Sequence, residues 1–532
     1  MQVKQLTPDL SVAPQVGTTD MADIAAQGFR SIICNRPDGE GADQPSFAEI
    51  EEAATAAGLR SRYVPVIPGK ISELDLAQFT AALSDLPKPV LAYCRSGSRS
   101  AQLWSLAQQR GEAASRSTAI GKPAASHDIV IVGGGAAGAA VAASLLRRNR
   151  DLDIAIIEPA ETHYYQPGWT MVGGGIFNAA STAKPMAAVL PSRVNWIKAA
   201  VTAFDPDNNT LVADGHAGVR YNHLVVCPGI KLDWGAIEGL SETLGKNGVT
   251  SNYRYDLAPY TWELVRAMKS GRALFTQPPM PIKCAGAPQK AMYLSADHWL
   301  REGVLNKIDI EFFNAGGVLF GVADYVPALM DYVKRYDAAL KFHHNLVAID
   351  GPGKTAFFKK TGSDGSVATV EARFDMIHVT PPQTTPDFVR ASPLVDTAGW
   401  VDVDQTTLRH KRYANIYGLG DVTNTPNAKT AAAARKQAPV VAENLLFDKG
   451  QRPSVYAYDG YGSCPLIVER GKVVLAEFTY GGKIASSFPP WLIDGTKPSR
   501  LAWLLKERIL PPIYWQAMLK GREWMAKPKA VS

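Results

Sequence analysis

The stretch that decides the fold is residues 127–148, which read HDIVIVGGGAAGAAVAASLLRR. The apolar run before the glycines predicts a buried strand, and the Ala-rich run after them predicts a helix. Between the two, Gly133, Gly135 and Gly138 form a G-x-G-x-x-G turn in the strand–turn–helix order that dinucleotide binding requires. The first glycine permits the tight turn, the second lets a pyrophosphate approach backbone N–H groups, and the third allows close packing of helix on strand.

An acidic residue follows this turn at the spacing typical of nucleotide sites. Glu158 lies twenty residues after Gly138 and ends the predicted second strand, DIAIIEP. At that position a carboxylate can accept hydrogen bonds from both ribose hydroxyls. The small side chains of Ala136 and Ala137 leave the N-terminus of the helix open to phosphate. The alternative is a glycine turn that serves packing alone. Because the strand, the helix and the acidic residue all lie at the spacing that a nucleotide site requires, a nucleotide site is favoured.

A second nucleotide signature lies far downstream, where NIYGLGD (residues 415–421) precedes a helix-like stretch, AKTAAAARKQAPVVAENLL. In two-domain flavoprotein disulfide reductases, an Asp in this context holds the ribityl chain, and the helix directs its N-terminus at the pyrimidine end of the flavin. We therefore expect Gly420, Asp421 and Lys429 to contact the cofactor. Two signatures predict tightly bound FAD rather than NAD.

The middle segment bears on the electron donor. A flavoenzyme reduced by NADH needs a second glycine fingerprint after the strand that opens its inserted domain. Here the strand-like residues 273–276 lead instead into QPPMPIKCAGAPQKAMYLS, which presents Cys284 just before a helix. A helix N-terminus favours the thiolate form of such a cysteine. The alternative is a buried structural cysteine.

The N-terminal region has its own cysteine motif, in which PVLAY runs into Cys94 and the loop CRSGSRS. Successive backbone N–H groups around a cysteine at a helix N-terminus can cradle an anion. Cysteine phosphatases place an arginine six residues after the nucleophile, where this chain has Ser100. The pattern C-R-x-G-x-R, with Arg95 and Arg99, is instead similar to rhodanese-type sulfurtransferases, so sulfur transfer is favoured over phosphatase activity.

Composition excludes several classes of protein. The 532 residues are 46% hydrophobic and 20% charged, which is typical of a folded multidomain chain. A formal charge of +6 is too small to predict nucleic-acid binding. Five separated cysteines without a C-x-x-C pair argue against a metal site or a secreted disulfide framework and favour a reducing compartment. We find no signal-peptide pattern and no apolar run long enough to span a bilayer.

These patterns predict an α/β chain with several parts. Residues 1–110 form a small phosphatase-like α/β sandwich, and the stretch 111–126 is a linker that is small, polar and without an apolar period. Residues 127–448 contain two Rossmann-type dinucleotide-binding domains, the second inserted at about 240–375. Residues 449–532 form a hairpin and amphipathic helices at a membrane interface.

Several stretches together carry a family resemblance. They are HYYQPGWTMVGGG, PIKCAGAPQKAMYLS, HVTPPQTTPDFV, AGWVDVDQTTLRH, GLGD with PNAKTAAA, and YDGYGSCPL with LAEF. Residues 127–525 thereby resemble the mitochondrial and related bacterial branch of the sulfide:quinone oxidoreductases. The resemblance implies a monotopic flavoprotein that oxidises sulfide at a cysteine pair and passes two electrons through FAD to a ubiquinone-like quinone. Residues 1–110 resemble the domain that accompanies β-lactamase-like persulfide dioxygenases, which is similar in fold to dual-specificity phosphatases.

The resemblance also assigns the cysteines. Cys284 matches the family cysteine that receives sulfur and attacks the flavin. The second family cysteine is expected just after the G-D motif, where this chain has Val422 and Thr423, so the pair is expected to be incomplete. Cys227 is a candidate substitute, although a small apolar filler is the commoner role for such a residue. Cys464 is interpreted as structural.

The tail, SRLAWLLKERILPPIYWQAMLKGREW, mixes apolar, aromatic and basic residues and suits an interfacial helix pair that opens a quinone site to lipid. A soluble amphipathic helix packed on the core is the alternative. Phe478, Phe488 and Tyr514 are candidates for stacking on the quinone. We expect a peripheral protein on the inner face of a bacterial cytoplasmic membrane, with a low-molecular-weight thiol or sulfite as sulfur acceptor.

Two other functions compete with sulfide oxidation. One is an NAD(P)H-dependent FAD oxidoreductase fused to a tyrosine-phosphatase-like domain, which the missing second glycine fingerprint opposes. The other is a flavin-bound redox sensor without catalysis, which only the apparent loss of the second cysteine supports. No metal and no nucleic acid are expected as ligands.

Overall fold

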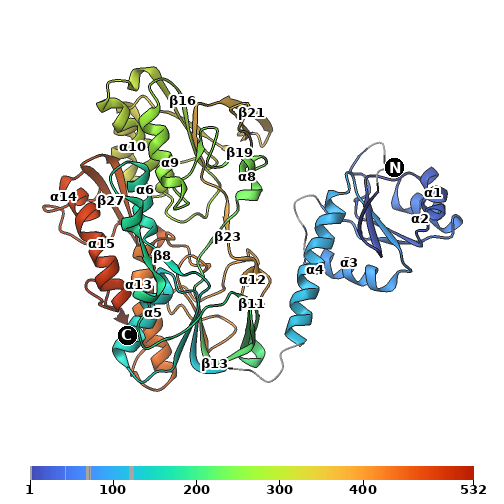
Figure 1. Ribbon diagram of the computed structural model, residues 1–532, viewed down its shortest axis with the longest axis horizontal. Coiled ribbons are helices and arrows are strands. Elements are labelled where there is room, and N and C mark those ends of the chain that lie inside the picture. The colour runs from blue at the N-terminus through green and yellow to red at the C-terminus, as the bar shows by residue number, and fades with distance from the viewer. Residues whose placement is uncertain (1–2, 42–43, 68–70, 72, 119–124, 532) are drawn as a thin grey trace. The chain divides into compact units, whose positions relative to one another are not determined.

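A computed structural model describes residues 3–531 except 42–43, 68–70, 72 and 119–124 (Figure 1). The chain divides into two compact units, Met1–Ala119 and Ile120–Ser532. Helix α4 (Ser98–Thr118) extends through residues 111–118, which the sequence predicted to be an aperiodic linker, and strand β6 begins at Ala125. Residues 111–118 of the expected linker are therefore helical, and residues 119–124 lie outside the described residues.

The first unit is a five-stranded sheet with helices on both faces. The strand order is β1 (Lys4–Thr7), β2 (Leu10–Ala13), β5 (Val90–Tyr93), β3 (Ser31–Cys34), β4 (Arg60–Tyr63), and only the β1–β2 pair is antiparallel. Helices α1 (Met21–Ala26), α2 (Phe47–Ala56), α3 (Glu73–Asp85) and α4 complete the unit. The three central strands are wholly buried because both faces are covered. Cys94 follows β5 at the carboxyl edge of this sheet.

The first sheet of the second unit positions the glycine turn. Its order is β10 (Asn195–Ile197), β7 (Ile154–Ile157), β6 (Ala125–Val132), β13 (His216–Val226), β12 (Thr210–Ala213), β11 (Val201–Asp205), and β24 (Ile416–Gly418) also pairs with β13. Strands β6, β7, β13 and β24 are parallel, with Val132, Val226 and Gly418 in register. The two predicted nucleotide signatures therefore end at the same edge of one sheet. Helices α5 (Ala136–Arg148) and α13 (Ala431–Asp448) follow them and pack against each other.

The second sheet of this unit is also parallel. Its order is β15 (Val249–Thr250), β22 (Met376–His378), β16 (Gly271–Gln277), β17 (Ile308–Asn314), β18 (Ala339–Phe342), with α9 (Leu257–Ala267), α10 (Ala287–Arg301) and α11 (Val326–Arg335) around it. An antiparallel sheet of β19 (His344–Asp350), β20 (Thr355–Thr361) and β21 (Val367–Arg373) follows. Two Rossmann-type sheets in one unit confirm the predicted fold class.

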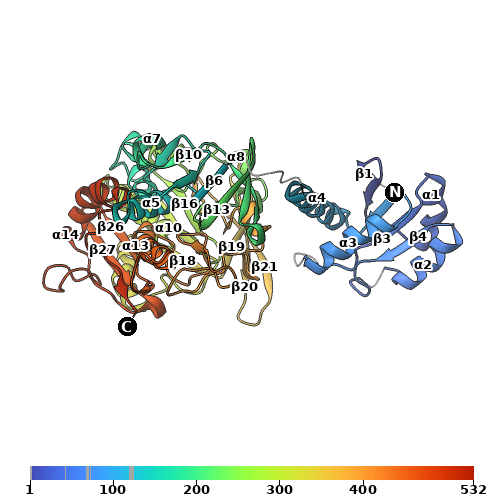
Figure 2. The ribbon, with the colours of Figure 1, turned by 90° about the horizontal axis from the view of Figure 1, so that it is seen from below.

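The C-terminal part is a hairpin followed by a helical tail. Strands β26 (Gly462–Glu469) and β27 (Lys472–Phe478) form the hairpin, and β26 lies against α10. The tail comprises α14 (Arg500–Leu504), η9 (Leu505–Ile509), α15 (Leu510–Pro512), η10 (Ile513–Ala517) and η11 (Met518–Lys520), of which η9 and η10 are π-helical. It contacts β27 at its start and α5 at its end, and Figure 2 shows the hairpin close to α14. Among the described helices, none is long and apolar enough to cross a membrane.

Candidate active site

The glycine turn between β6 and α5 has the geometry that nucleotide binding needs. Gly133 has φ +104°, and a Cβ there would lie 2.6 Å from the Cys227 carbonyl oxygen. A Cβ on Gly138 would lie 1.8 Å from the Gly133 carbonyl oxygen, so neither position accepts a side chain. Gly135, by contrast, has open space where its Cβ would be and faces the cavity described below. The turn is thus tight on the protein side and open on the ligand side.

Glu158 completes this half of the site. It follows β7, and its two carboxylate oxygens accept hydrogen bonds from the backbone N–H groups of Gly134 and Ala160, both at 2.8 Å. These bonds fix the carboxylate at the edge of the cavity, where the ribose of a dinucleotide is expected.

The second signature meets the first in space. Gly420 has φ +78°, its N–H donates to Gln437 at 2.7 Å, and a Cβ there would lie 3.2 Å from the Ala137 side chain. The Lys429 ammonium donates to the Asp421 carbonyl oxygen at 2.8 Å. Burial raises the pKa of Asp421 and lowers that of Lys429 to about 8, with each group's charge favouring the charged form of the other. The half-buried Asp421 and the buried Lys429 both lie on the cavity wall.

Gly135, Glu158, Gly420, Asp421 and Lys429 line one cavity of about 510 Å³. The open Gly135 face, the Glu158 carboxylate and the Asp421–Lys429 pair fit an extended dinucleotide with an anionic pyrophosphate and a polar ring. The residues present therefore fit a flavin dinucleotide. The same cavity continues to Cys284 and to the tail residues Lys506 and Tyr514.

Two cysteines meet in this cavity region. Cys284 Sγ lies 3.7 Å from Cys464 Sγ, and the Lys290 ammonium lies 3.2 Å from Cys284 Sγ. A disulfide needs about 2.05 Å, so this is a thiol contact from which a small movement forms the bond. Cys284 has φ +50°, a conformation that costs roughly 1–3 kcal/mol and is typical of functional sites, and its N–H donates to the Lys429 carbonyl oxygen at 2.8 Å.

A glycine makes the sulfur contact possible. Gly286 lies just before α10, and a Cβ there would be 2.7 Å from Cys464 Sγ and 2.2 Å from the Leu466 side chain. Any side chain at this position would push the hairpin away from α10.

This geometry corrects the expected roles of the cysteines. The expectation that Cys284 lacks a cysteine partner is wrong, because β26 carries Cys464, for which a structural role was expected, onto α10 beside Cys284. Cys227 instead points at the glycine turn, with its sulfur 3.6 Å from the Gly133 carbonyl oxygen, and burial raises its pKa. Val422 and Thr423 are wholly buried behind the G-D turn.

Lysines set the electrostatics of the cysteine pair. The hydrogen bond from Cys464 lowers the pKa of Cys284 well below its usual value, and the Lys290 ammonium adds to this against the cost of burial. The same hydrogen bond, together with burial, raises the pKa of Cys464. Lys506 is 3% exposed, donates to the Pro167 carbonyl oxygen at 3.0 Å, and has its pKa lowered to about 7 by burial and by Lys290. Of the two cysteines, Cys284 is thus the one whose surroundings favour the thiolate form.

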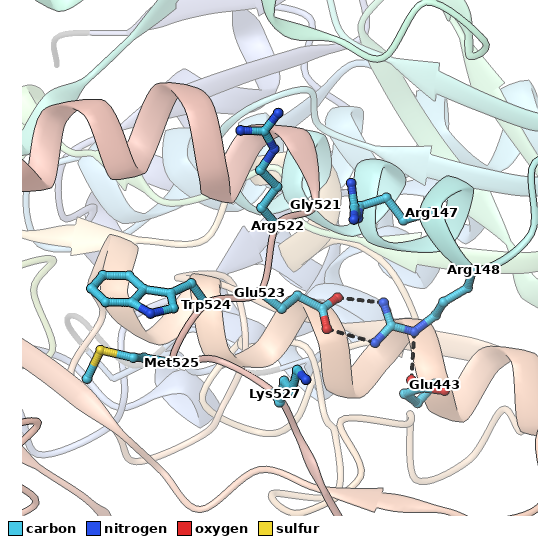
Figure 3. A pocket seen from close by; sticks show the side chains of 9 residues that line it. All are labelled: Arg147, Arg148, Glu443, Gly521, Arg522, Glu523, Trp524, Met525 and Lys527. Atoms are coloured by element: carbon cyan, nitrogen blue, oxygen red, sulfur yellow. Dashed lines mark hydrogen bonds and ion pairs between the residues drawn. The ribbon is translucent and has the colours of Figure 1, made fainter.

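The tail is tied to the flavin half of the unit. Tyr514 and the His163 ring nitrogen share a hydrogen bond of 2.7 Å. Farther along, Glu523 makes two hydrogen bonds to the Arg148 guanidinium, which also bonds Glu443 (Figure 3). These three side chains are 12–15% exposed, so their ion pairs are partly shielded from solvent. The tail therefore forms part of the cavity wall.

The N-terminal cysteine loop is built at the end of β5. Cys94 is 1% exposed, and Gly97 supplies φ +82° in the turn before α4. The Arg99 guanidinium does not project freely into solvent: it donates to the carbonyl oxygens of Asn35 and Val66 and forms an ion pair of 2.7 Å with Glu40. Arg95 is exposed at the loop surface.

Comparison with known proteins assigns the larger unit. A curated mitochondrial sulfide:quinone oxidoreductase from Dictyostelium discoideum is 42% identical over 377 residues, which cover 70% of this chain and 81% of that protein. The chain belongs to the sulfide:quinone oxidoreductase family. The family model for pyridine nucleotide-disulphide oxidoreductases matches residues 127–270, which implies a flavin cofactor. The solved sulfide:quinone oxidoreductase of Aquifex aeolicus shares the fold, with TM-score 0.61 at 20% identity over 75% of this chain and 92% of that one.

The smaller unit has different relatives. The phosphatase-like domain of the beta-lactamase hydrolase-like proteins matches residues 2–111. A beta-lactamase hydrolase-like protein from Xylella fastidiosa is 36% identical over 108 residues, which cover 20% of this chain and 25% of that protein. The chain is therefore a phosphatase-like domain joined to a member of the sulfide:quinone oxidoreductase family, as the sequence predicted.

Lys290, Cys464 and Lys506 are the site residues that sequence reasoning missed. Lys290 lies in the quoted stretch PIKCAGAPQK, six residues after Cys284, a separation that is neither i+3 nor i+4, so helical spacing does not mark it; it reaches Cys284 because the chain turns at that cysteine before α10 begins. No local pattern marks Lys506, since basic residues occur throughout the amphipathic tail.

Proposed function

We propose that the larger unit oxidises sulfide to sulfane sulfur at Cys284 and Cys464 and delivers two electrons through FAD to a ubiquinone-like quinone. The observation that carries this proposal is the pair of sulfurs 3.7 Å apart: Cys284 and the adjacent Lys290 line the cavity that fits a dinucleotide, and Cys464 is buried against Cys284. A nicotinamide-reduced enzyme would need a phosphate cradle after β16, where this chain has the cysteine loop.

We infer that Gly133, Gly135, Gly138, Ala136 and Ala137 hold the pyrophosphate. Glu158 would hold the ribose, and the Asp421–Lys429 pair with Gly420 the ribityl and ring portion. When bound, the flavin accepts two electrons from the thiol pair and passes them to the quinone.

The cysteines divide the sulfur chemistry between them. In the oxidised enzyme, HS⁻ attacks the disulfide, the S–S bond breaks, and one cysteine becomes a persulfide while the other leaves as a thiolate. The thiol of lower pKa leaves more readily, so Cys284 is the leaving thiolate and Cys464 takes the sulfur. We therefore propose that the sulfane sulfur forms on Cys464, and not on Cys284, where it was expected from the sequence. An acceptor thiolate or sulfite then removes the sulfane sulfur and leaves Cys464 as a thiol. When the disulfide re-forms, the Cys284 thiolate and the Cys464 thiol together lose two electrons and one proton.

Anaerobic addition of sulfide to the purified, yellow protein tests this function. We expect loss of the flavin absorbance within the mixing time of a stopped-flow instrument, and its return on addition of a short-chain quinone. A flavin that stays oxidised in excess sulfide but is reduced by NADH would contradict the proposal.

The quinone is expected at the apolar end of the cavity. Phe488, Leu510, Ile513 and Tyr514 line that end, whereas the half-buried Phe478 does not line the cavity and packs edge-on against Phe320. Nearby parts of the chain expose apolar side chains, namely Trp491, Leu492, Leu501 and Leu504, and Trp491 is 84% exposed. Such a surface suits peripheral docking on a membrane that supplies the quinone, which we place at the inner face of a bacterial cytoplasmic membrane.

The N-terminal unit is proposed to transfer sulfur through Cys94. The carboxylate of Glu40 and two backbone carbonyl groups engage Arg99, so this arginine cannot swing freely to clamp a phosphate dianion. Backbone N–H groups of the loop and the exposed Arg95 suffice for a persulfide monoanion. Joining both units in one chain raises the effective concentration of Cys94 around the site that makes sulfane sulfur.

Cys94→Ser is expected to lower thiosulfate:cyanide and glutathione-persulfide transfer by roughly 10³-fold or more, because a hydroxyl cannot carry the sulfur. Flavin reduction by sulfide should not change. Cys34→Ser is the matched control, since Cys34 is the other buried cysteine of this unit. Full transferase activity in Cys94→Ser, together with ready phosphotyrosine hydrolysis by the unaltered protein, would favour the phosphatase alternative.

A further inference from the structure

The hairpin β26–β27 has two faces with different tasks. Cys464 pairs with Ala476, and both face α10 in the core. Because side chains alternate along a strand, the neighbouring pair, Ser463 and Glu477, points the other way. Ser463 and Glu477 line the cavity together with Leu475, on the side where Phe488 and the tail close it. The hairpin thus separates the sulfur site from the apolar end of the same cavity.

Glu477 is a buried carboxylate that forms no ion pair among the described residues, although Lys436, which lies over the Tyr461 ring, interacts with it electrostatically. Glu477 is 5% exposed. Its Oε1 accepts hydrogen bonds from the hydroxyl groups of Tyr461 and Ser487, each at 2.5 Å, and its Oε2 accepts one from the Ser487 N–H at 2.9 Å. Burying a carboxylate costs free energy unless hydrogen bonds compensate, and three donors supply that compensation here. One lone pair of Oε2 has no donor in this set, so this oxygen can still take up a proton.

The other carboxylates of the cavity have assigned tasks. Glu158 binds the glycine turn, and Asp421 is charge-paired with Lys429. The described part of the chain contributes three carboxylates to the cavity wall. Of these, Glu477 alone lies on the hairpin, at the apolar end of the cavity. An apolar site would bury a simple hydrophobic residue more cheaply at this position, so a retained carboxyl group points to chemistry.

Quinone reduction supplies a reason for this acid. A quinone that receives two electrons also needs two protons to become the quinol, and an apolar cavity holds little water to provide them. We propose that Glu477 is the proton donor to the quinone, an inference that rests on the proposed function. As electrons arrive, the carboxyl O–H bond breaks and an O–H bond forms on one quinone oxygen. Tyr461 and Ser487 hold the carboxylate that remains, a proton from bulk solvent restores the acid, and the second proton reaches the reduced quinone by the same relay through Glu477.

The test uses Glu477→Gln, which keeps the size of the side chain and one acceptor oxygen but cannot donate an acidic proton. Full-length enzyme is reduced anaerobically with dithionite and mixed with decylubiquinone. A general acid contributes about 10²–10⁴-fold, so we expect reoxidation to slow at least 10²-fold at saturating quinone. The quinone dissociation constant, from quenching of tryptophan fluorescence, should change less than threefold. Ferricyanide takes electrons without protons and should reoxidise both proteins equally fast.

Further measurements separate proton donation from packing. Reoxidation of the unaltered enzyme by quinone should show a solvent deuterium isotope effect above 2. The substitution Tyr461→Phe should alter this isotope effect. Glu469→Gln makes the same change on the same hairpin, outside the cavity, and should behave as the unaltered protein. Should Glu477→Gln fail to bind flavin, Glu477→Asp keeps the acid and should retain most of the rate. Reoxidation of Glu477→Gln at the normal rate, or a loss explained by quinone affinity alone, would overturn the inference. Because dithionite replaces sulfide, a failure of the proposed sulfide reaction would be seen separately.

Discussion

Replacing Cys464 with serine is expected to abolish reduction of the flavin by sulfide, with a rate loss of roughly 10³-fold or more. A serine hydroxyl cannot form the disulfide that HS⁻ attacks, and Cys284 loses the partner whose sulfur lies 3.7 Å away. Stopped-flow spectroscopy of the flavin at fixed sulfide concentration measures this rate. The flavin content of the purified variant should not change, since Cys464 lies on the hairpin and not on the glycine turn.

Cys227→Ser separates this pairing from the alternative considered from the sequence. Its sulfur contacts the Gly133 carbonyl oxygen, so the substitution buries a hydroxyl at the turn and is expected to weaken flavin retention by a modest amount. The rate of sulfide-dependent reduction per bound flavin should stay within about threefold of the unaltered protein, a difference worth less than 1 kcal/mol. If Cys464→Ser still reacts fast and Cys227→Ser does not, the pairing proposed here is wrong.

Gly286→Ala is also expected to slow the reaction with sulfide strongly, at a position that carries no reactive group. The added Cβ would meet Cys464 Sγ at 2.7 Å and the Leu466 side chain at 2.2 Å. Overpacking of this kind costs about 1–3 kcal/mol and would displace β26 from α10. A displacement of about 1 Å between reacting groups can slow a reaction about 10²-fold, so we expect a loss of that order in flavin reduction by sulfide.

Titration of free thiols measures the displacement of β26 from α10 without relying on enzyme turnover. After mild oxidation, the unaltered protein should lose two titratable thiols as Cys284 and Cys464 join, whereas Gly286→Ala should retain them. Gly321→Ala is the matched control, because its Cβ would meet nothing within 4 Å and its φ lies outside the left-handed region. Normal kinetics in Gly286→Ala would show that the hairpin adjusts without separating the sulfurs.

The nucleotide half of the site could be predicted because its determinants are local. The run HDIVIVGGGAAG specifies a strand, a turn and a helix through apolar periodicity and through glycines at positions where a Cβ would strike backbone. The G-D signature is equally local, and strand pairing at the sheet edge brings it to Ala137. The place of Cys284 follows in the same way from a strand, a loop and a helix in sequence.

The partner of Cys284 could not be predicted in this way. Cys464 lies 180 residues away and reaches Cys284 only because the hairpin packs on α10, where Gly286 leaves room for its sulfur. A cysteine's partner is set by packing between distant segments, and no periodicity or spacing records that packing. The sequence by itself determined the flavin-type fold, the thiol loop after β16 and the cysteine loop of the N-terminal unit. Only the tertiary structure decided that Cys464 rather than Cys227 meets Cys284, and that Lys506 and Glu477 enter the same cavity, because these contacts join segments that are far apart in the chain.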